Sequence, residues 1–237
     1  GMARLPIAEQ LKIDQRFRDL MDAKSGQSGL TPESLAKATR ITEDALNLYH
    51  DSYDSCIAYL DRQLGVLLDE MRRRGLLENT FVIVTSDHGE QLGEHGVIDH
   101  GTSVYRQEVH VPLLLIPPSR SSRPRAVVEP VSLREIPATV AQWAQLGPRS
   151  PFPGRSLTRF LGDRTERLPE ASPVLSELQH NVVFPESGDR PSGFHAVSSL
   201  VSRGLVYIRA DDGREELYDL INDPLESTDL TKDPASR

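Results

Sequence analysis

The sequence predicts an α/β fold followed by a smaller antiparallel β subdomain. A long helical pattern of apolar residues leads into a strand of β-branched residues at 80–85, and a second apolar strand follows at 111–116. Short strand-like segments then come in close succession at 173–178, 194–202, 205–209 and 215–220. The 237 residues, 38% of them hydrophobic and 26% charged, are typical of a globular protein with its own core.

The first helix is predicted from Ile41 to Arg74, after a polar extension over residues 1–40. Apolar residues recur there at three- and four-residue spacing, so they form one stripe that we expect to be buried. The members of this stripe are Leu46, Tyr49, Tyr53, Ile57, Leu60, Leu64, Leu67 and Met71. Cys56 lies within this helix and is expected to be a core cysteine. Gly75 follows three arginines and supplies the helix stop.

A second amphipathic helix is predicted over residues 132–146, with Ser132 as its N-cap and Gly147 at its end. Asp211-Asp212-Gly213 predicts a hairpin turn between the last two strands. Composition shifts to proline, glycine and arginine between the second helix and the C-terminal strands. We therefore expect three parts: a polar extension over 1–40, a partial α/β domain over 41–165 and an antiparallel subdomain over 166–237.

Charge and composition exclude several classes of protein. The formal net charge of −8 argues against nucleic acid and anionic membranes as general partners. Cys56 is the single cysteine, so the chain has no internal disulfide and no cysteine-based metal cluster. No apolar run approaches the roughly 20 residues that a membrane-spanning helix needs. The first residues show no signal-peptide pattern, and the sequence leaves the localisation open.

Asp87 and His88 stand at the end of the first predicted strand, which is where open α/β sheets place ligands. A carboxylate and an imidazole side by side can bind a divalent cation, because both are metal ligands near neutral pH. Residues 89–105 add further histidines, acidic residues and glycines before the second strand begins. The sequence therefore predicts a site loop between two strands, with Asp87 and His88 as metal ligands.

Several motifs surround this pair in a definite order. They are Gly75-Leu76-Leu77 before the first strand, Leu92-Gly93-Glu94-His95-Gly96, His100-Gly101, Tyr105, Val111-Pro112-Leu113-Leu114, residues 131–139, residues 154–157 and residues 216–226. This order resembles the sulfatases, which belong to the alkaline phosphatase superfamily of metal-dependent hydrolases, and the resemblance covers residues 41–230. It implies a three-layer α/β/α alkaline-phosphatase-like domain, incomplete in this chain, ahead of the antiparallel subdomain.

The resemblance also implies roles for individual residues. Asp87 and His88 match the second pair of metal ligands in sulfatases, where calcium is usual and zinc or manganese is the alternative. His100 falls where sulfatases have a lysine or histidine that contacts the sulfate and assists the leaving group. A cation and a protonated imidazole beside a transferring sulfuryl group would stabilise its growing negative charge. The implied substrate is a small-molecule or carbohydrate sulfate ester.

The sequence departs from sulfatases at the nucleophile. Sulfatases convert a cysteine or serine to formylglycine within a Cys/Ser-x-Pro/Ala-x-Arg motif, and the stretch from Cys56 to Leu60 has leucine at the arginine position. We therefore expect only the C-terminal half of a sulfatase, without formylglycine and inactive by itself.

Two alternatives remain. One is a phosphodiesterase or phosphoryl transferase of the same superfamily that uses zinc or manganese. The other is a truncated, non-catalytic protein that binds a partner or forms a homo-oligomer through an exposed sheet edge.

Overall fold

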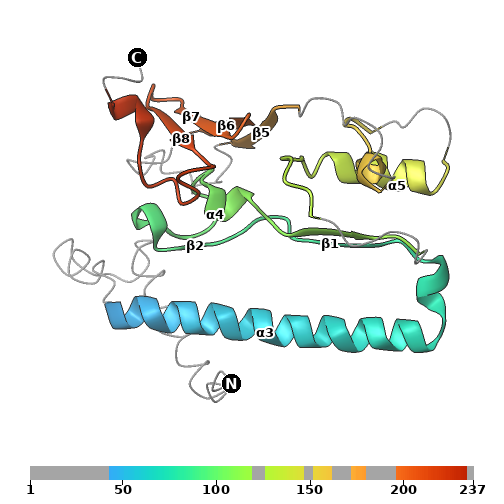
Figure 1. Cartoon of the computed structure of the whole chain (residues 1–237). Helices are drawn as coiled ribbons and strands as arrows, with labels where there is room; N and C mark the ends of the chain where they lie inside the picture. The colour runs from blue at the N-terminus through green and yellow to red at the C-terminus, as the bar shows by residue number, and fades with distance from the viewer. Residues whose placement is uncertain (1–42, 119–125, 147–151, 162–171, 180–195, 234–237) are drawn as a thin grey trace, which may run out of the picture. The chain divides into compact units, whose positions relative to one another are not determined.

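The computed structural model describes residues 43–118, 126–146, 152–161, 172–179 and 196–233 (Figure 1). The helices are α3 (Glu43–Arg73), η1 (Leu76–Asn79), η2 (Glu94–Gly96), α4 (Arg106–Val109), α5 (Glu135–Trp143), η3 (Leu157–Phe160) and η4 (Leu230–Lys232). The strands are β1 (Val82–Thr85), β2 (Gln91–Leu92), β3 (Ile98–Asp99), β4 (Leu113–Ile116), β5 (Val174–Leu178), β6 (Val197–Ser202), β7 (Leu205–Ala210) and β8 (Glu215–Asp219). The chain divides into two compact units, residues 1–80 with 92–98, and residues 81–91 with 99–237. The predicted polar extension over 1–40 and the predicted helix stop at Gly147 lie outside the described residues.

The first predicted helix is confirmed as α3, which ends where the sequence places its stop. Gly75 adopts a left-handed φ of 69°, a conformation that glycine takes at little cost. Arg72 and Arg73 occupy the last turn, where their charges favour the negative end of the helix dipole. No helix among the described residues is both long enough and apolar enough to cross a bilayer, α3 included.

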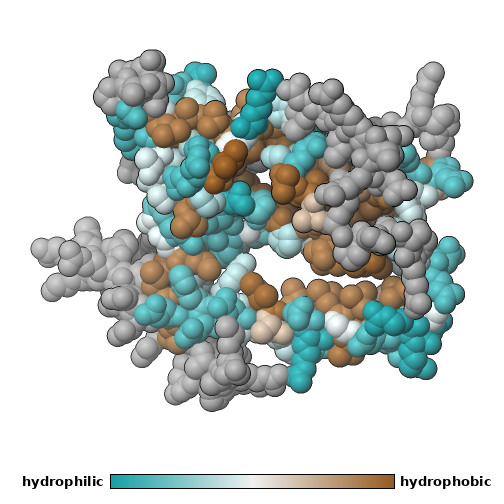
Figure 2. All heavy atoms as spheres, in the orientation of Figure 1, coloured by the Kyte–Doolittle hydropathy of each residue, from teal (hydrophilic) through white to brown (hydrophobic). Residues whose placement is uncertain are grey.

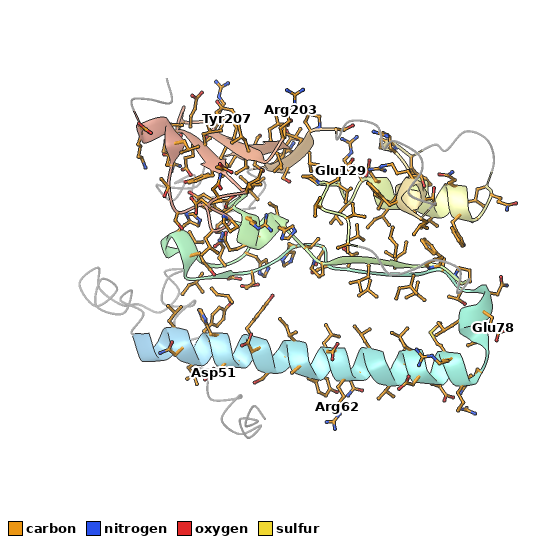
Figure 3. All side chains as sticks on the ribbon, viewed as in Figure 1. Asp51, Arg62, Glu78, Glu129, Arg203 and Tyr207 are labelled. Carbon is orange, nitrogen blue, oxygen red and sulfur yellow. The ribbon has the colours of Figure 1, made fainter. Side chains whose placement is uncertain are left out.

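The predicted burial of the α3 stripe is wrong for Ile57, Leu60 and Leu67, which are exposed, whereas the other stripe residues are half-buried. Leu60 and Leu67 are 57% and 55% exposed, and Cys56, predicted to be a core cysteine, is also exposed. Figure 2 shows apolar atoms gathered along one side of this helix, and Figure 3 shows Arg62 on the opposite, polar side. Besides α3, the described part of this unit contains only η1 and residues 92–98, too little to cover a helix of 31 residues.

Strands β1 and β4 confirm the two apolar strands that flank the site loop. They pair antiparallel, with Val82 opposite Ile116 and Thr85 opposite Leu113. Strands as apolar as these are expected to be buried, but Val82, Ile83 and Val84 of β1 are only half-buried, and Leu114 and Ile116 of β4 remain 50% and 40% exposed. The sheet contains only these two strands among the described residues, so one face of β4 lacks cover.

The second predicted helix is confirmed but is shorter than residues 132–146. The Ser132 carbonyl accepts the Glu135 N–H at 2.9 Å in a turn that precedes α5, and the N-cap position is Arg134 instead of Ser132. Gln145 has a left-handed φ of 53°, which ends the helical path soon after Trp143. The Trp143 ring stacks on Phe81 next to β1, with centroids 4.5 Å apart, and so attaches α5 to the strand pair.

The C-terminal strands form the four-stranded antiparallel sheet β5-β6-β7-β8, as their spacing predicts (Figure 1). The predicted turn is confirmed between β7 and β8, where the Ala210 N–H donates to the Arg214 carbonyl at 2.9 Å. Gly213 has a φ of 88°, which this tight turn requires. Val206, Ile208 and Tyr218 form the core of the sheet together with Val104, a residue of the site loop.

Candidate metal centre

The first segment of the candidate centre, residues 86–90, follows the end of β1 and is called its first arm. The Ser86 hydroxyl donates to the His88 carbonyl at 2.7 Å, and Asp87 Oδ1 accepts the His88 N–H at 3.1 Å. These local bonds turn the chain as it leaves the strand. The Asp87 side chain is 89% exposed and that of His88 is 43% exposed, so both side chains reach solvent.

His88 is held in one tautomer. Its Nδ1 lies 2.9 Å from the Gly89 carbonyl oxygen, and because a carbonyl only accepts, Nδ1 carries the proton and donates. The lone pair therefore belongs to Nε2, which lies 3.8 Å from Asp87 Oδ2. Ligand atoms sit at roughly 2.0–2.5 Å from a divalent ion, so two atoms this far apart can bind the same ion.

Hydrogen bonds and charges shift the acidity of both residues. The pKa of His88 is raised first by the bond to the Gly89 carbonyl and then by the negative charges of Asp87, Glu90 and Glu108, against the opposing effect of burial. The pKa of Asp87 is lowered first by a backbone hydrogen bond and then by the charge of His88, so Asp87 is ionised at neutral pH. A carboxylate is therefore ready for a cation, and a proton and a cation compete for Nε2 of His88.

The second arm, residues 99–103, contains His100 immediately after β3. His100 Nδ1 lies 3.0 Å from Glu90 Oε2 and 3.0 Å from Asp99 Oδ1. Carboxylates only accept, so Nδ1 carries a proton here as well, and Nε2 is the atom available to a ligand. The His100 ring stacks on that of His88, with centroids 4.2 Å apart and planes at 25°. The structure therefore brings together two histidines that lie 12 positions apart.

His88, Glu90 and His100 form the one cluster among the described residues in which three potential ligand atoms lie within 4.8 Å of one another. Asp87 is not part of this cluster, although it lies beside His88. Sequence reasoning did not single out Glu90. The signal in the sequence was its place two residues after His88.

The sulfatase family model matches residues 22–146, which is more than half of the chain and includes both arms of the centre. The chain belongs to the sulfatase family. This confirms the family that the order of motifs predicts.

Two sulfatases show the extent of the likeness. An uncharacterized sulfatase of Escherichia coli strain K12, YidJ, is 28% identical over 198 residues, which are 84% of this chain and 37% of that protein. The choline-sulfatase of Rhizobium meliloti strain 1021 is 29% identical over 202 residues, which are 82% of this chain and 35% of the relative. The chain thus spans just over a third of the length of these curated relatives.

Solved structures establish the fold class. A protein described as a putative sulfatase, from Bacteroides thetaiotaomicron VPI-5482, superposes with a TM-score of 0.70 at 20% identity and covers 90% of this chain and 45% of that chain. The phosphonate monoester hydrolase of Agrobacterium radiobacter gives a TM-score of 0.67 at 24% identity, covering 83% of this chain and 40% of that chain. The chain therefore has the alkaline-phosphatase-like α/β fold of sulfatases. The same fold carries both a sulfatase and a phosphonate hydrolase, so fold alone does not select the ester.

Proposed function

We propose that this chain carries the metal-binding part of a sulfatase site that hydrolyses a sulfate monoester. In this proposal Asp87 and His88 bind a divalent cation, and His100 contacts the sulfate group. The stacking of His88 and His100 carries the proposal, because it sets a metal ligand and a proton donor side by side at the end of a strand. Membership of the family supports the sulfate ester as the substrate class.

The proposed chemistry assigns one task to each side chain. The cation would draw negative charge from the sulfate oxygens and so stabilise the charge that grows there during transfer. In its doubly protonated form, His100 would donate from Nε2 to the leaving oxygen while Nδ1 stays on Glu90 and Asp99. The nucleophile would be formylglycine, for which the 237 residues contain no Cys/Ser-x-Pro/Ala-x-Arg sequence.

Two assignments of the ion make different predictions. The resemblance to sulfatases favours calcium bound through Asp87 and His88. The cluster of His88, Glu90 and His100 instead offers two nitrogens and one oxygen, a donor set that suits zinc or manganese better than calcium. Calorimetric titration with Ca²⁺, Zn²⁺ and Mn²⁺ separates them. Asp87→Asn should abolish binding under the first assignment, and Glu90→Gln should do so under the second.

An activity assay tests the proposal that the nucleophile is missing. We expect no hydrolysis of an aryl sulfate by the 237-residue chain, with or without added metal. Turnover that disappears on His100→Ala would show that the chain holds a complete site and would overturn this part of the proposal. Failure of all three ions to bind would overturn the metal site itself.

A phosphate or phosphonate ester hydrolase is the second candidate. The superposition on a phosphonate monoester hydrolase and the nitrogen-containing donor set support it. Elemental analysis that finds two transition-metal ions per chain, with hydrolysis of an aryl phosphonate but not of an aryl sulfate, would favour this candidate over the first.

The architecture beyond the described strands is also proposed. We propose a polar extension over 1–40, a partial three-layer α/β/α domain over 41–165 and an antiparallel subdomain over 166–237, to be tested by limited proteolysis. Strands β1 and β4 have no further strand partner among the described residues, which supports a homo-oligomer through this sheet edge. Sedimentation that shows a monomer at high concentration would refute the oligomer.

A further inference from the structure

The single helical turn α4 contains a buried acid that contacts the loop beyond His100. Glu108 is only 5% exposed. Its Oε1 accepts the N–H of Gly101 at 2.5 Å, and its Oε2 accepts both the N–H of Ser103 at 3.2 Å and the Ser103 hydroxyl at 2.8 Å. One carboxylate thus binds three donors in the segment that directly follows His100, and hydrogen bonds to a charged acceptor are the strong ones.

The main chain of the same turn binds the other arm. The Glu108 carbonyl accepts the N–H of Gly89 at 2.6 Å, and the Gln107 carbonyl accepts the N–H of Glu90 at 3.1 Å. A Cβ on Gly89 would overlap the Gln107 carbonyl oxygen, so the two segments approach as closely as their backbones allow. Glu108 therefore contacts the residue after His88 through its carbonyl and the residue after His100 through its side chain.

We propose that Glu108 is a positioning residue that sets the distance between His88 and His100. The inference rests on the proposed metal site and adds to it the residue that keeps the two arms at working distance. A bond to the immediate neighbour of each histidine leaves little freedom in either backbone, and residues that orient metal ligands in this way strongly affect metal affinity.

A purely structural role for Glu108 makes a different prediction. If Glu108 only stabilised the fold, a substitution elsewhere that destabilised the protein by the same amount would weaken metal binding by the same factor. Glu135 supplies the matched control, because it is a second buried glutamate, 8% exposed, whose carboxylate pairs with Arg159 at 2.8 Å on α5 and η3. Glu135 does not contact either arm in any described hydrogen bond or ion pair.

The experiment compares Glu108→Gln with Glu135→Gln by calorimetric titration with Zn²⁺, Mn²⁺ and Ca²⁺, at temperatures where circular dichroism shows both variants folded. The amide keeps the size of the side chain but replaces one acceptor oxygen by a donor, which faces the donors of Gly101 or Ser103. We expect Glu108→Gln to weaken binding by about 10- to 100-fold and Glu135→Gln to leave it within about twofold. Equal losses in both variants, or no loss in Glu108→Gln, would overturn the proposal.

A second measurement separates this proposal from the metal site on which it rests. The stacked rings of His88 and His100 should give a nuclear Overhauser effect in the metal-free chain. Glu108→Gln should remove it and Glu135→Gln should keep it, whether or not the wild type binds an ion. If the wild type binds no metal ion, the proposed function fails, but the nuclear Overhauser effect still decides the role of Glu108. Persistence of this effect in Glu108→Gln would refute that role. Should Glu108→Gln not fold, Ser103→Ala removes one of the three donors and should weaken the same effect.

Discussion

Gly89→Ala tests the closeness of the two arms with the smallest change available to a side chain. Gly89 has no left-handed φ, so alanine can adopt its backbone conformation, and the cost comes from overlap alone. The added methyl carbon would lie only 2.0 Å from the Gln107 carbonyl oxygen, a backbone atom that cannot rotate away. The strand end and α4 must therefore separate.

The magnitude follows from the bonds that this separation breaks. Two hydrogen bonds would break: the one from the Gly89 N–H to the Glu108 carbonyl, at 2.6 Å, and the one from the Glu90 N–H to the Gln107 carbonyl, at 3.1 Å. Each contributes about 0.5–1.5 kcal/mol, so we expect a loss of about 1–3 kcal/mol in the free energy of unfolding. His88 and Glu90 would move away from His100, and metal affinity should fall by about 10- to 100-fold.

Thermal denaturation and metal titration of Gly89→Ala together provide the assay, with Gly65→Ala as the control. Gly65 lies inside α3 with open space around its Cβ position, so alanine there should stabilise the helix by about 0.5–1 kcal/mol and leave metal binding unchanged. The reasoning would be refuted if Gly89→Ala were as stable as the wild type and bound metal equally well.

Three further predictions concern stability and pH. Thr139→Val should lower the free energy of unfolding by about 1–3 kcal/mol, because the fully buried hydroxyl accepts the Leu157 N–H at 2.8 Å. In the same denaturation experiment, Thr158→Val, at a less buried threonine, should show less than half that loss. Burial raises the pKa of Glu226 above its ordinary 4.5, so its contribution to stability is complete below pH 4.5 and is lost as pH rises through the folded pKa. Glu226→Gln should thus gain stability over the wild type as pH rises above 4.5, and a pH-independent difference in melting temperature would contradict this. The raised pKa of His88 means that protons compete for Nε2 above the ordinary 6.5, so titrations should show metal affinity falling as pH drops towards that value, a dependence that His88→Ala should reduce.

The C-terminal sheet could be predicted from sequence almost strand by strand, because its signals are local. Alternating residues and an Asp-Gly turn define β7 and β8 without reference to the rest of the chain. Burial was predicted less well, because it depends on what lies across from a residue. The periodicity of α3 correctly gives a helix with an apolar stripe, yet Leu60 is 57% exposed among the described residues. A pattern indicates which face can be buried, and only the assembled fold shows whether anything covers it.

The loop that contains the candidate centre could be predicted from the sequence, but the contacts between its residues could not. The end of β1 and the histidines of the loop were visible in the sequence, and the structure stacks His88 on His100. Glu90 Oε2 lies 3.0 Å from His100 Nδ1 because the chain folds back on itself within ten residues. Local sequence rules do not predict a contact over that separation. The role proposed for Glu108 has the same origin, since its three donors become neighbours only when α4 turns back towards the loop.

The motif near the C-terminal end of the sequence contacts the helical turn α4. Residues 216–226 look like a separate signature in the sequence, about 110 positions after the site loop. In the structure, Glu226 Oε2 accepts the N–H of Arg106 at 2.8 Å, and Glu216 Oε2 accepts the Tyr105 hydroxyl at 2.9 Å. Both contacts reach the start of α4, the turn that binds the two arms of the centre. Glu216 of β8 and Glu226, which follows the sheet, therefore support α4, while Glu108 connects this turn to residues next to His88 and His100. If Glu108 sets the spacing of His88 and His100 as proposed, residues 216–226 stabilise the turn on which that spacing depends, which gives a physical reason for both motifs to occur in one chain.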